Sequence, residues 1–476
     1  MTMKNKIRKI SDQKTLKPNR ALTLGSKSAQ AIRPSLIALA IAQAIVVPST
    51  RAADIVVDNN LDAGVGCTLR DAVTAMNDGV IGSTGCVNSN VNSFGTDDQI
   101  LLGAGLDIIS LTNGALDINR DLLIRSISSN ITIQGDGNDR IMTLDLATNT
   151  LLEGLTLTGG AGVVSGGAIY VRFGDLVLND CTISNNTASY GGGGINARNA
   201  RVTLNNSSVI NNQVNGTVAS ANGGGILAFG NSTLSINNSS VSGNTAVSSG
   251  SFARGGGLHI VEGSLSITNS TFSNNYSSLT GGGISISNAS ARATISNSTI
   301  SANSATNSGG IFIAGGASAV ILNSTISGNS ASVRGGGIDV VGSASLTLIN
   351  SIVANSDGGY DCSNISSTIN AASINIIEDG SCATDALSVD PKLGPLRDNG
   401  GTTLTHALLS GSPAIGTAFS LSCGGPPVNN VDQRGKPRLP PAPAAGFCDL
   451  GAYEFVDETS FFVVPVKNGK AVIFSL

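Results

Sequence analysis

The chain has 476 residues, of which 60 are glycine, 4% are aromatic and none is tryptophan, so a conventional core of bulky aromatic side chains is excluded. Between residues 151 and 350 there are only five acidic residues, six Arg and no Lys. The chain therefore lacks the basic stripe that binding to nucleic acid requires.

The first 53 residues differ sharply from the rest. Nine Lys or Arg residues and a single acid, Asp12, precede an apolar run over 36–47. A run of this length is too short to span a bilayer, and Thr50-Arg51-Ala52 supplies small residues for cleavage. We interpret residues 1–53 as a secretory signal with a long basic leader and expect no transmembrane span in the mature chain; a retained amphipathic anchor is the alternative.

Residues 54–99 are predicted to cap the next domain. Thr68-Leu69-Arg70-Asp71 matches a helix start, and Leu69, Ala72, Val73 and Met76 share one helical face. An open stack of strands needs such a cover at its end. The run from Cys67 to Val73 also resembles the CSLREA domain, which occurs at the start of many secreted β-helix proteins.

Residues 100–356 are dominated by a run of glycines followed by an aliphatic residue, which returns every 26 to 32 residues. Such a period predicts a solenoid. The aliphatic residues are Ile169, Ile195, Ile226, Leu258, Ile284, Ile311 and Ile338.

Two columns of Asn keep the same period, and amides stacked in such columns can chain from coil to coil. The first column is Asn206, Asn238, Asn269, Asn297 and Asn323. The second is Asn186, Asn212, Asn244, Asn275, Asn303 and Asn329.

Within each unit, apolar and small polar residues alternate with a period of two, as in Leu234 and Ile236, so the elements are strands. Three short strands per unit of about 27 residues predict one coil of a parallel β-helix, an all-β fold. The glycine runs, together with Phe272-Ser273-Asn274-Asn275, resemble the repeats of polymorphic outer-membrane proteins and other right-handed parallel β-helix surface proteins. The right hand follows from this resemblance.

Residues 357–456 resemble a choice-of-anchor domain of the Q type. The matching segments include Asp398-Asn399-Gly400-Gly401, Thr405-His406-Ala407-Leu408 and Asp449-Leu450-Gly451-Ala452-Tyr453-Glu454. Such domains usually precede an anchoring tail, which implies a surface protein. Residues 457–476 are predicted to form a hairpin tail that turns at Asn468-Gly469.

Six of the seven cysteines form near neighbours outside the repeat, and in an oxidising compartment they are candidates for structural disulfides. They are Cys67 with Cys86, Cys362 with Cys382, and Cys423 with Cys448. Cys181 occupies a column that otherwise holds Ser, so we expect it to be a buried free thiol.

The strongest catalytic candidates on the solenoid are Arg254, His259 and Glu262. They form its densest polar group, but His259 and Glu262 are an odd number of residues apart and would face opposite sides of one strand. Glycoside hydrolysis needs two neighbouring carboxyl groups, and the five acidic residues between 151 and 350 offer no clear pair. A solvated face is therefore the favoured interpretation, and we assign no catalytic residue, no metal ligand and no cofactor.

These patterns favour a secreted or cell-surface protein of a Gram-negative bacterium that is structural or adhesive. Rows of Ser, Thr and Asn suit hydrogen bonding to a polysaccharide or to another cell surface, and we expect a monomer. The alternative is a polysaccharide lyase or glycoside hydrolase of the pectin lyase-like fold, since fold alone does not decide function. Ice binding by the Thr and Ser rows is a third, weaker alternative.

Overall fold

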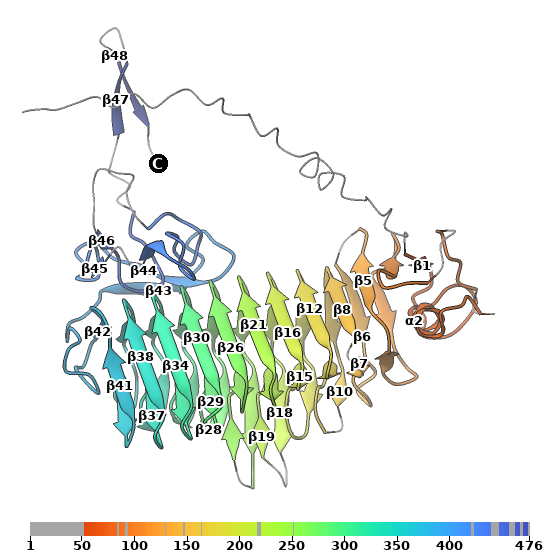
Figure 1. Cartoon of the computed structure of the whole chain (residues 1–476), viewed down its shortest axis with the longest axis horizontal. Helices are drawn as coiled ribbons and strands as arrows, with labels where there is room; N and C mark the ends of the chain where they lie inside the picture. Colours follow the sequence, from red (N-terminus) through yellow and green to blue (C-terminus); the bar gives the residue numbers. More distant parts are fainter. Residues whose placement is uncertain are drawn as a thin grey trace, which may run out of the picture. The chain divides into compact units, whose positions relative to one another are not determined.

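The structure is a computed structural model that describes residues 52–82, 85–90, 94–128, 130–145, 148–162, 164–216, 220–250, 252–419, 423–438, 447–456, 462–466 and 470–474. The chain winds through stacked coils whose strands pair in parallel with their counterparts in the next coil (Figure 1). Three long sheets result, as the repeat predicts. The predicted signal segment and the predicted turn at Asn468-Gly469 lie outside the described residues, apart from Ala52 and Ala53.

The three sheets are named here by their number of described strands. The twelve-stranded sheet contains β1 (Asp54–Val57), β2 (Gln99–Leu102), β5 (Leu122–Ser126), β8 (Asn149–Glu153), β12 (Asp175–Asn179), β16 (Arg201–Asn205), β21 (Thr233–Asn237), β26 (Ser264–Thr268), β30 (Arg292–Ser296), β34 (Ser318–Leu322), β38 (Ser345–Ile349) and β41 (Thr368–Ala371). The eleven-stranded sheet contains β3 (Ile108–Ser110), β6 (Ile131–Gln134), β9 (Leu155–Thr158), β13 (Thr182–Ser184), β17 (Ser208–Ile210), β22 (Ser240–Ser242), β27 (Thr271–Ser273), β31 (Thr299–Ser301), β35 (Thr325–Ser327), β39 (Ile352–Ala354) and β42 (Ile376–Ile377). The ten-stranded sheet contains β4 (Leu116–Ile118), β7 (Met142–Asp145), β11 (Ile169–Arg172), β15 (Ile195–Arg198), β20 (Ile226–Phe229), β25 (Leu258–Ile260), β29 (Ile284–Ser287), β33 (Ile311–Ala314), β37 (Ile338–Val341) and β40 (Cys362–Ile365).

A fourth sheet, here called the loop sheet, is formed by the segments that follow, in each coil, the strand of the eleven-stranded sheet and precede the glycine run. It contains β10 (Ala161–Gly162), β14 (Thr187–Ala188), β18 (Gln213–Gly216), β19 (Ala221–Asn222), β23 (Thr245–Ser248), β24 (Ala253–Arg254), β28 (Tyr276–Thr280), β32 (Ser304–Asn307) and β36 (Ser330–Arg334). Its strands β18, β19 and β28 project below the other sheets in Figure 1.

The aliphatic residue after each glycine run points into the solenoid. From Ile169 to Ile338 these residues pair with one another in adjacent strands, and each is fully buried. Inward apolar side chains on all three sheets form one continuous core, so each additional coil buries the apolar face of the coil before it. The predicted all-β parallel β-helix is confirmed.

The N-terminal end is covered by the helix predicted there, α2 (Leu69–Asp78), seen end-on beside β1 in Figure 1. The Thr68 side chain accepts a hydrogen bond from the Asp71 amide, which satisfies one free donor at the helix start. Leu69, Val73 and Met76 are buried in the solenoid core. A disulfide joins Cys67, just before the helix, to Cys86.

The solenoid extends past residue 356, because β40, β41 and β42 continue the three sheets in register. One coil thus falls inside the segment that the sequence assigns to the C-terminal domain. Disulfides join Cys362 to Cys382 and Cys423 to Cys448. Beyond the last coil, β43 (Leu393–Arg397) pairs with β44 (Thr405–Leu408), β45 (Ala418–Phe419) with β46 (Phe447–Cys448), and β47 (Phe462–Val466) with β48 (Lys470–Phe474), all antiparallel.

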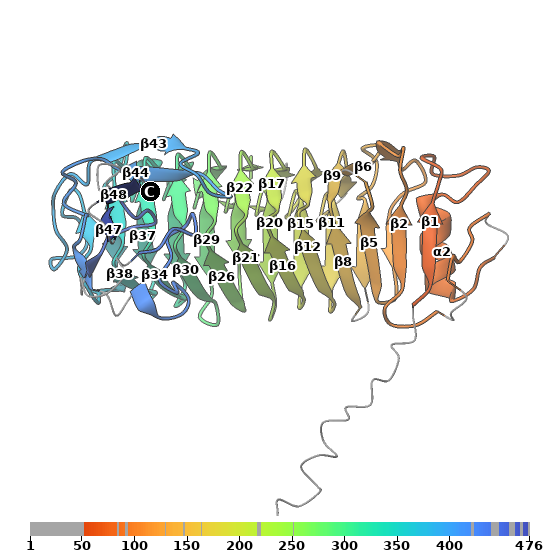
Figure 2. The same cartoon turned by 90° about the horizontal axis from the view of Figure 1, so that it is seen from above.

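The described residues of the C-terminal segment, 391–419, 423–438 and 447–456, fold back over the eleven-stranded sheet, where β43 and β44 cross its last coils (Figure 2). The Thr299 hydroxyl donates to the Gln433 side-chain oxygen over 2.6 Å, and the Ser301 hydroxyl lies 2.9 Å from His406 Nε2. The outward Thr and Ser row is therefore covered from β27 onward. Only the earlier coils leave that row open to a ligand, which shortens the polar face expected from the sequence.

The two Asn columns have different structures. In the second column, each side-chain amide donates to the amide oxygen of the next coil over 2.9–3.0 Å, which makes a buried ladder from Asn186 to Asn329. The ladder predicted for the first column does not form, since no hydrogen bond joins two of its described side chains; the Asn297 amide donates to the Val431 carbonyl instead. Residues Asn206, Asn238, Asn269, Asn297 and Asn323 take left-handed backbone angles, with φ between 45° and 51°. Asn serves there as a residue that tolerates this turn conformation.

Candidate ligand-binding site

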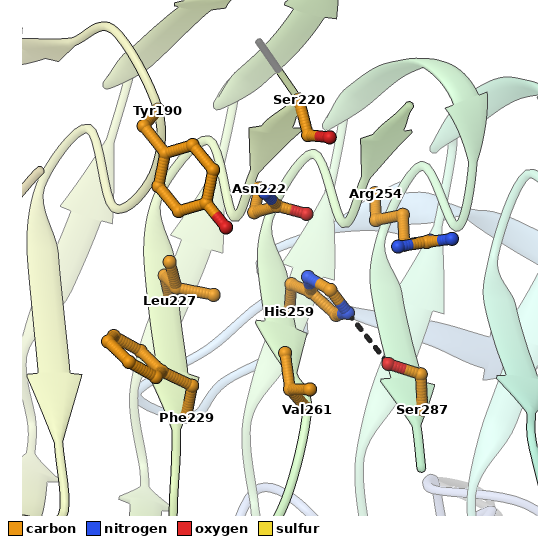
Figure 3. Close-up of a pocket in the computed structure, with 9 residues that line it drawn as sticks. All are labelled: Tyr190, Ser220, Asn222, Leu227, Phe229, Arg254, His259, Val261 and Ser287. Carbon is orange, nitrogen blue, oxygen red and sulfur yellow. Dashed lines mark hydrogen bonds between the residues drawn. The ribbon is translucent and has the colours of Figure 1, made fainter. Parts of the chain in front are cut away.

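The site begins with the sequence Arg254-Gly255-Gly256-Gly257-Leu258-His259, where the chain leaves the loop sheet and enters the ten-stranded sheet. Gly255 has φ 66°, and a Cβ atom there would clash with the Leu258 carbonyl. Glycine is favoured at this tight turn, because it has no Cβ atom and adopts a positive φ without strain. The turn lets Arg254 at the end of β24 and His259 in β25 face the same space outside the solenoid (Figure 3).

That space is a hollow of about 230 Å³ bounded by the loop sheet and the ten-stranded sheet. Figure 3 shows Arg254 and Asn222 reaching in from the loop sheet, and Leu227 and His259 from the neighbouring strands β20 and β25. The lining residues are Tyr190, Ser220, Asn222, Leu227, Phe229, Arg254, His259, Val261 and Ser287. Aromatic, hydroxyl, amide and cationic groups thus converge there, and no carboxylate is among the described lining residues.

His259 is 1% exposed, although it points away from the solenoid core. Its Nε2 lies 2.9 Å from the Ser287 hydroxyl, while its Nδ1 is buried without a hydrogen-bond partner in the described structure. Burial, together with the charge of Arg254, lowers the pKa of His259 to about 3. The imidazole is therefore neutral at physiological pH, so it is a poor proton donor and a weak base.

Arg254 carries the positive charge of the hollow. Its guanidinium lies 4.7 Å from the ring centroid of Phe252. A second guanidinium, that of Arg198, lies 5.3 Å from the ring centroid of Phe229, which lines the hollow. Both contacts are within the range of cation–π attraction, so they favour fixed orientations of these side chains.

Glu262 does not join this site. Its side chain accepts a hydrogen bond from the Asn288 amide over 2.9 Å, and it is not among the residues lining the hollow. Of the three catalytic candidates, the structure thus brings Arg254 and His259 together and leaves Glu262 apart. An acid–base pair of His259 and Glu262 across the hollow has no geometric support.

The acidic residues of the repeat are engaged elsewhere. Asp175 pairs with Arg201 at 2.9 Å on the outside of the twelve-stranded sheet. Asp180 occupies a left-handed turn position, with φ 53°, and belongs to the first Asn column. Within the described residues, no group of three or more His, Cys, Asp or Glu side chains is arranged to hold a metal ion.

Sequence reasoning missed most of the lining. His259 lies in an outward column that also contains Tyr170, Asn196, Leu227, Ser285, Phe312 and Asp339. Most of these outward side chains are buried, because the loop sheet covers them. A usable signal was present: Tyr190, Asn222 and Arg254 each directly precede a glycine run, and the repeat places them side by side.

Comparison with known proteins identifies the repeat. A family model described as a right-handed β-helix region matches residues 124–305 and 256–391, which together span more than half of the chain. No curated protein matches the sequence. In the parts of the chain that the structure describes, no helix has the length and apolar character needed to cross a membrane.

Proposed function

The chain belongs to the family of right-handed β-helix proteins, and from this premise we propose that it is a secreted or cell-surface protein that binds glycans without cleaving them. The carrying observation is the hollow between the loop sheet and the ten-stranded sheet, where aromatic and polar side chains converge around one cation. Pockets of this kind, with a few directed polar groups on an apolar wall, are typical ligand sites.

The chemistry of the hollow favours binding over cleavage. Glycoside hydrolysis needs two carboxyl groups about 5–9.5 Å apart, whereas the described lining residues carry none. A lyase needs a group that accepts a proton from the sugar ring. The low pKa of His259, about 3, makes its imidazole a weak base for this step.

The polar rows of the eleven-stranded sheet offer a second contact surface. On β13, β17 and β22 the outward residues are half-buried Thr, Ser and Ile side chains, and none of them has a hydrogen bond to a described C-terminal residue. Hydroxyl groups repeated at about 4.8 Å from coil to coil suit several weak hydrogen bonds to a chain of sugars. Secretion and a bacterial surface location form part of the proposal and are supported by the charged leader and apolar run in residues 1–53.

The test incubates the purified protein with a panel of neutral and acidic polysaccharides, with and without Ca²⁺. Retention on the immobilised glycan and the appearance of new reducing or unsaturated ends are followed together. Retention without new ends is expected. New ends in the wild type that disappear in Arg254→Gln would favour the lyase or hydrolase alternative, and absence of retention across the panel would reject glycan binding.

A further inference from the structure

The sequence that forms the hollow, an Arg followed by three glycines, an aliphatic residue and a polar residue, occurs at two places in the solenoid. Arg254-Gly-Gly-Gly-Leu258-His259 and Arg334-Gly-Gly-Gly-Ile338-Asp339 have the same spacing, and each Arg ends a loop-sheet strand. Strand register links the two sites step by step. The Arg column runs from Arg254 to Arg334 through Thr280 and Asn307. The partner column runs from His259 to Asp339 through Ser285 and Phe312.

In the second of these two sites, the space that faces the arginine is occupied by a side chain of the protein itself, Asp339. Arg334 Nη2 lies 3.1 Å from Asp339 Oδ2, and the Asp339 side chain is completely buried. A carboxylate therefore fits the space that faces the arginine. The contact is an ion pair, in which a guanidinium and a carboxylate attract each other by charge. Neither Asp339 oxygen has a hydrogen-bond partner of good geometry in the described structure.

In the first copy the carboxylate is missing from the chain itself. His259 stands where Asp339 stands in the second copy, and no described carboxylate forms an ion pair with Arg254. The space is open as the 230 Å³ hollow. His259 Nδ1 is buried in this lining without a partner. Because buried polar atoms in folded proteins almost always have a partner, this atom marks a place for a ligand or an ordered water.

We propose that the hollow binds the carboxylate of an acidic sugar, with Arg254 as the ion-pair partner and His259 Nδ1–H as a hydrogen-bond donor. This inference rests on the proposed glycan-binding function and names the ligand class of that site. In this state Nε2 of His259 accepts a hydrogen bond from the Ser287 hydroxyl, which leaves the proton on Nδ1.

The other side chains that line the hollow can contact the ring and the hydroxyl groups of the sugar. Tyr190, Leu227 and Phe229 supply apolar surface, while Asn222 and Ser220 supply groups that can bond to hydroxyls. The volume is below the roughly 300–1,000 Å³ of pockets that enclose drug-sized ligands. The hollow therefore suits one acidic sugar at the end of a chain or at a branch.

The experiment compares two matched probes by calorimetric titration. One is a disaccharide ending in glucuronate, and the other is the same disaccharide with its carboxyl group reduced to the alcohol. The wild type is expected to bind the acidic form at least tenfold more tightly. Arg254→Gln is expected to abolish this preference, and the control Arg201→Gln, which alters an arginine on the outside of the twelve-stranded sheet, is expected to retain it.

The variant His259→Asp gives an independent arm, because it copies the Arg334–Asp339 pair into the first site. Its own carboxylate would occupy the position, so binding of the acidic probe should fall at least tenfold while the melting temperature stays equal or rises. Unchanged binding in this variant would overturn the inference. Equal affinity of the wild type for both probes would also overturn it, while retention on the polysaccharide panel would leave the proposed function standing.

Discussion

Ser308 occupies a backbone position that is glycine in the other coils. The corresponding residues at the start of the glycine turns are Gly166, Gly192, Gly223, Gly255, Gly281 and Gly335, and all have positive φ. Ser308 has φ 61° and is fully buried, and its hydroxyl has no hydrogen-bond partner in the described structure. This residue therefore combines backbone strain with an unsatisfied polar group.

Replacing this serine should stabilise the solenoid. In Ser308→Gly the left-handed conformation no longer costs about 1–2 kcal/mol, which exceeds the roughly 0.4–1 kcal/mol by which glycine favours the unfolded chain. With the buried hydroxyl removed as well, we expect a gain of about 1 kcal/mol, measured as a higher midpoint of thermal unfolding. The reverse change in the preceding coil, Gly281→Ser, should lower the midpoint. A lower midpoint for Ser308→Gly would contradict the strain argument.

Cys181 is a probe of the solenoid interior. All of the other six cysteines are in disulfides, and Cys181 is 1% exposed, as its place in the Ser column predicts. Burial raises the pKa of its thiol to about 11, so the reactive thiolate is scarce at pH 8. We expect a thiol reagent to label no cysteine in the native protein and one in denaturant. Rapid labelling of the native protein would show that the coils around β13 open readily, and Cys181→Ser provides the blank.

At the level of single elements, the Asn ladder joins neighbouring coils through buried hydrogen bonds. Asn244 Nδ2 donates to the Val209 carbonyl and to the Asn275 side-chain oxygen, over 2.8 and 3.0 Å. Its Oδ1 accepts from both the backbone and the side-chain nitrogen of Asn212. Each ladder residue thus pairs groups from the coil before it and the coil after it, in a buried place that water does not reach.

Removing one ladder residue should therefore be costly. Asn244→Ala leaves the Val209 carbonyl and two Asn212 donors without partners, and each unsatisfied buried group costs about 1–3 kcal/mol. We expect a loss of about 3 kcal/mol or more, measured as a fall in the urea midpoint. The matched change Asn215→Ala, at an exposed position of β18, should alter stability by less than about 0.5 kcal/mol. Equal effects of the two changes would mean that the ladder adds nothing specific.

The sequence predicted the elements well where stacking alone determines them. A repeat that places Ile195, Ile226 and Leu258 in one column leaves a single register for the strands, and the structure has that register. The same period does not determine which hydrogen bonds a recurring polar side chain makes. Asn is favoured both in amide ladders and in left-handed turns, so the sequence could not separate the two Asn columns. Nor could it show that the loop sheet covers the outward column at His259 and makes the hollow.

At the scale of the whole molecule, the C-terminal segment clamps the last coils of the solenoid. Arg438 is completely buried, and its guanidinium donates to Asn297 on the solenoid and to the Gly451 carbonyl, over 2.9 and 2.7 Å. The Ala452 amide donates to the Thr325 hydroxyl over 3.0 Å. The contacts to Asn297 and Thr325 join residues more than a hundred positions apart, and Arg438 and Ala452 lie outside the repeat, so no period in the sequence predicts them.

The clamp contains an imbalance of charge. The Arg434 and Arg438 guanidinium groups lie among the carboxyl groups of Asp432, Asp449 and Glu454, all buried or nearly so. Three carboxylates against two cations would leave one buried negative charge, which is unfavourable in this setting. Burial and the neighbouring Asp449 raise the pKa of Glu454 from 4.5 to about 8, so Glu454 holds the extra proton at neutral pH.

This proton makes the clamp sensitive to alkaline pH. In the unfolded chain Glu454 ionises above about pH 4.5, whereas in the folded chain it stays protonated until about pH 8, so the folded state binds more protons and its stability falls as the pH rises between these values. In Glu454→Gln the side chain is neutral in both states and this loss disappears. We expect the variant to match the wild type near pH 4 and to be more stable at pH 8 by on the order of 2–4 kcal/mol, since one pKa unit corresponds to about 1.4 kcal/mol.

The measurement is the midpoint of thermal unfolding of both proteins from pH 4 to pH 9. The difference between the two curves should widen between about pH 4.5 and pH 8 and level off above that. Glu262→Gln is the control, because Glu262 lies on the solenoid surface away from the clamp and should give a pH-independent difference. A variant that loses stability at pH 8 would mean that Glu454 is ionised and serves as the counter-charge of Arg438. In that case the surplus proton of the clamp would have to reside on Asp449, whose pKa is also raised by burial, and Asp449→Asn would then become the stabilising change.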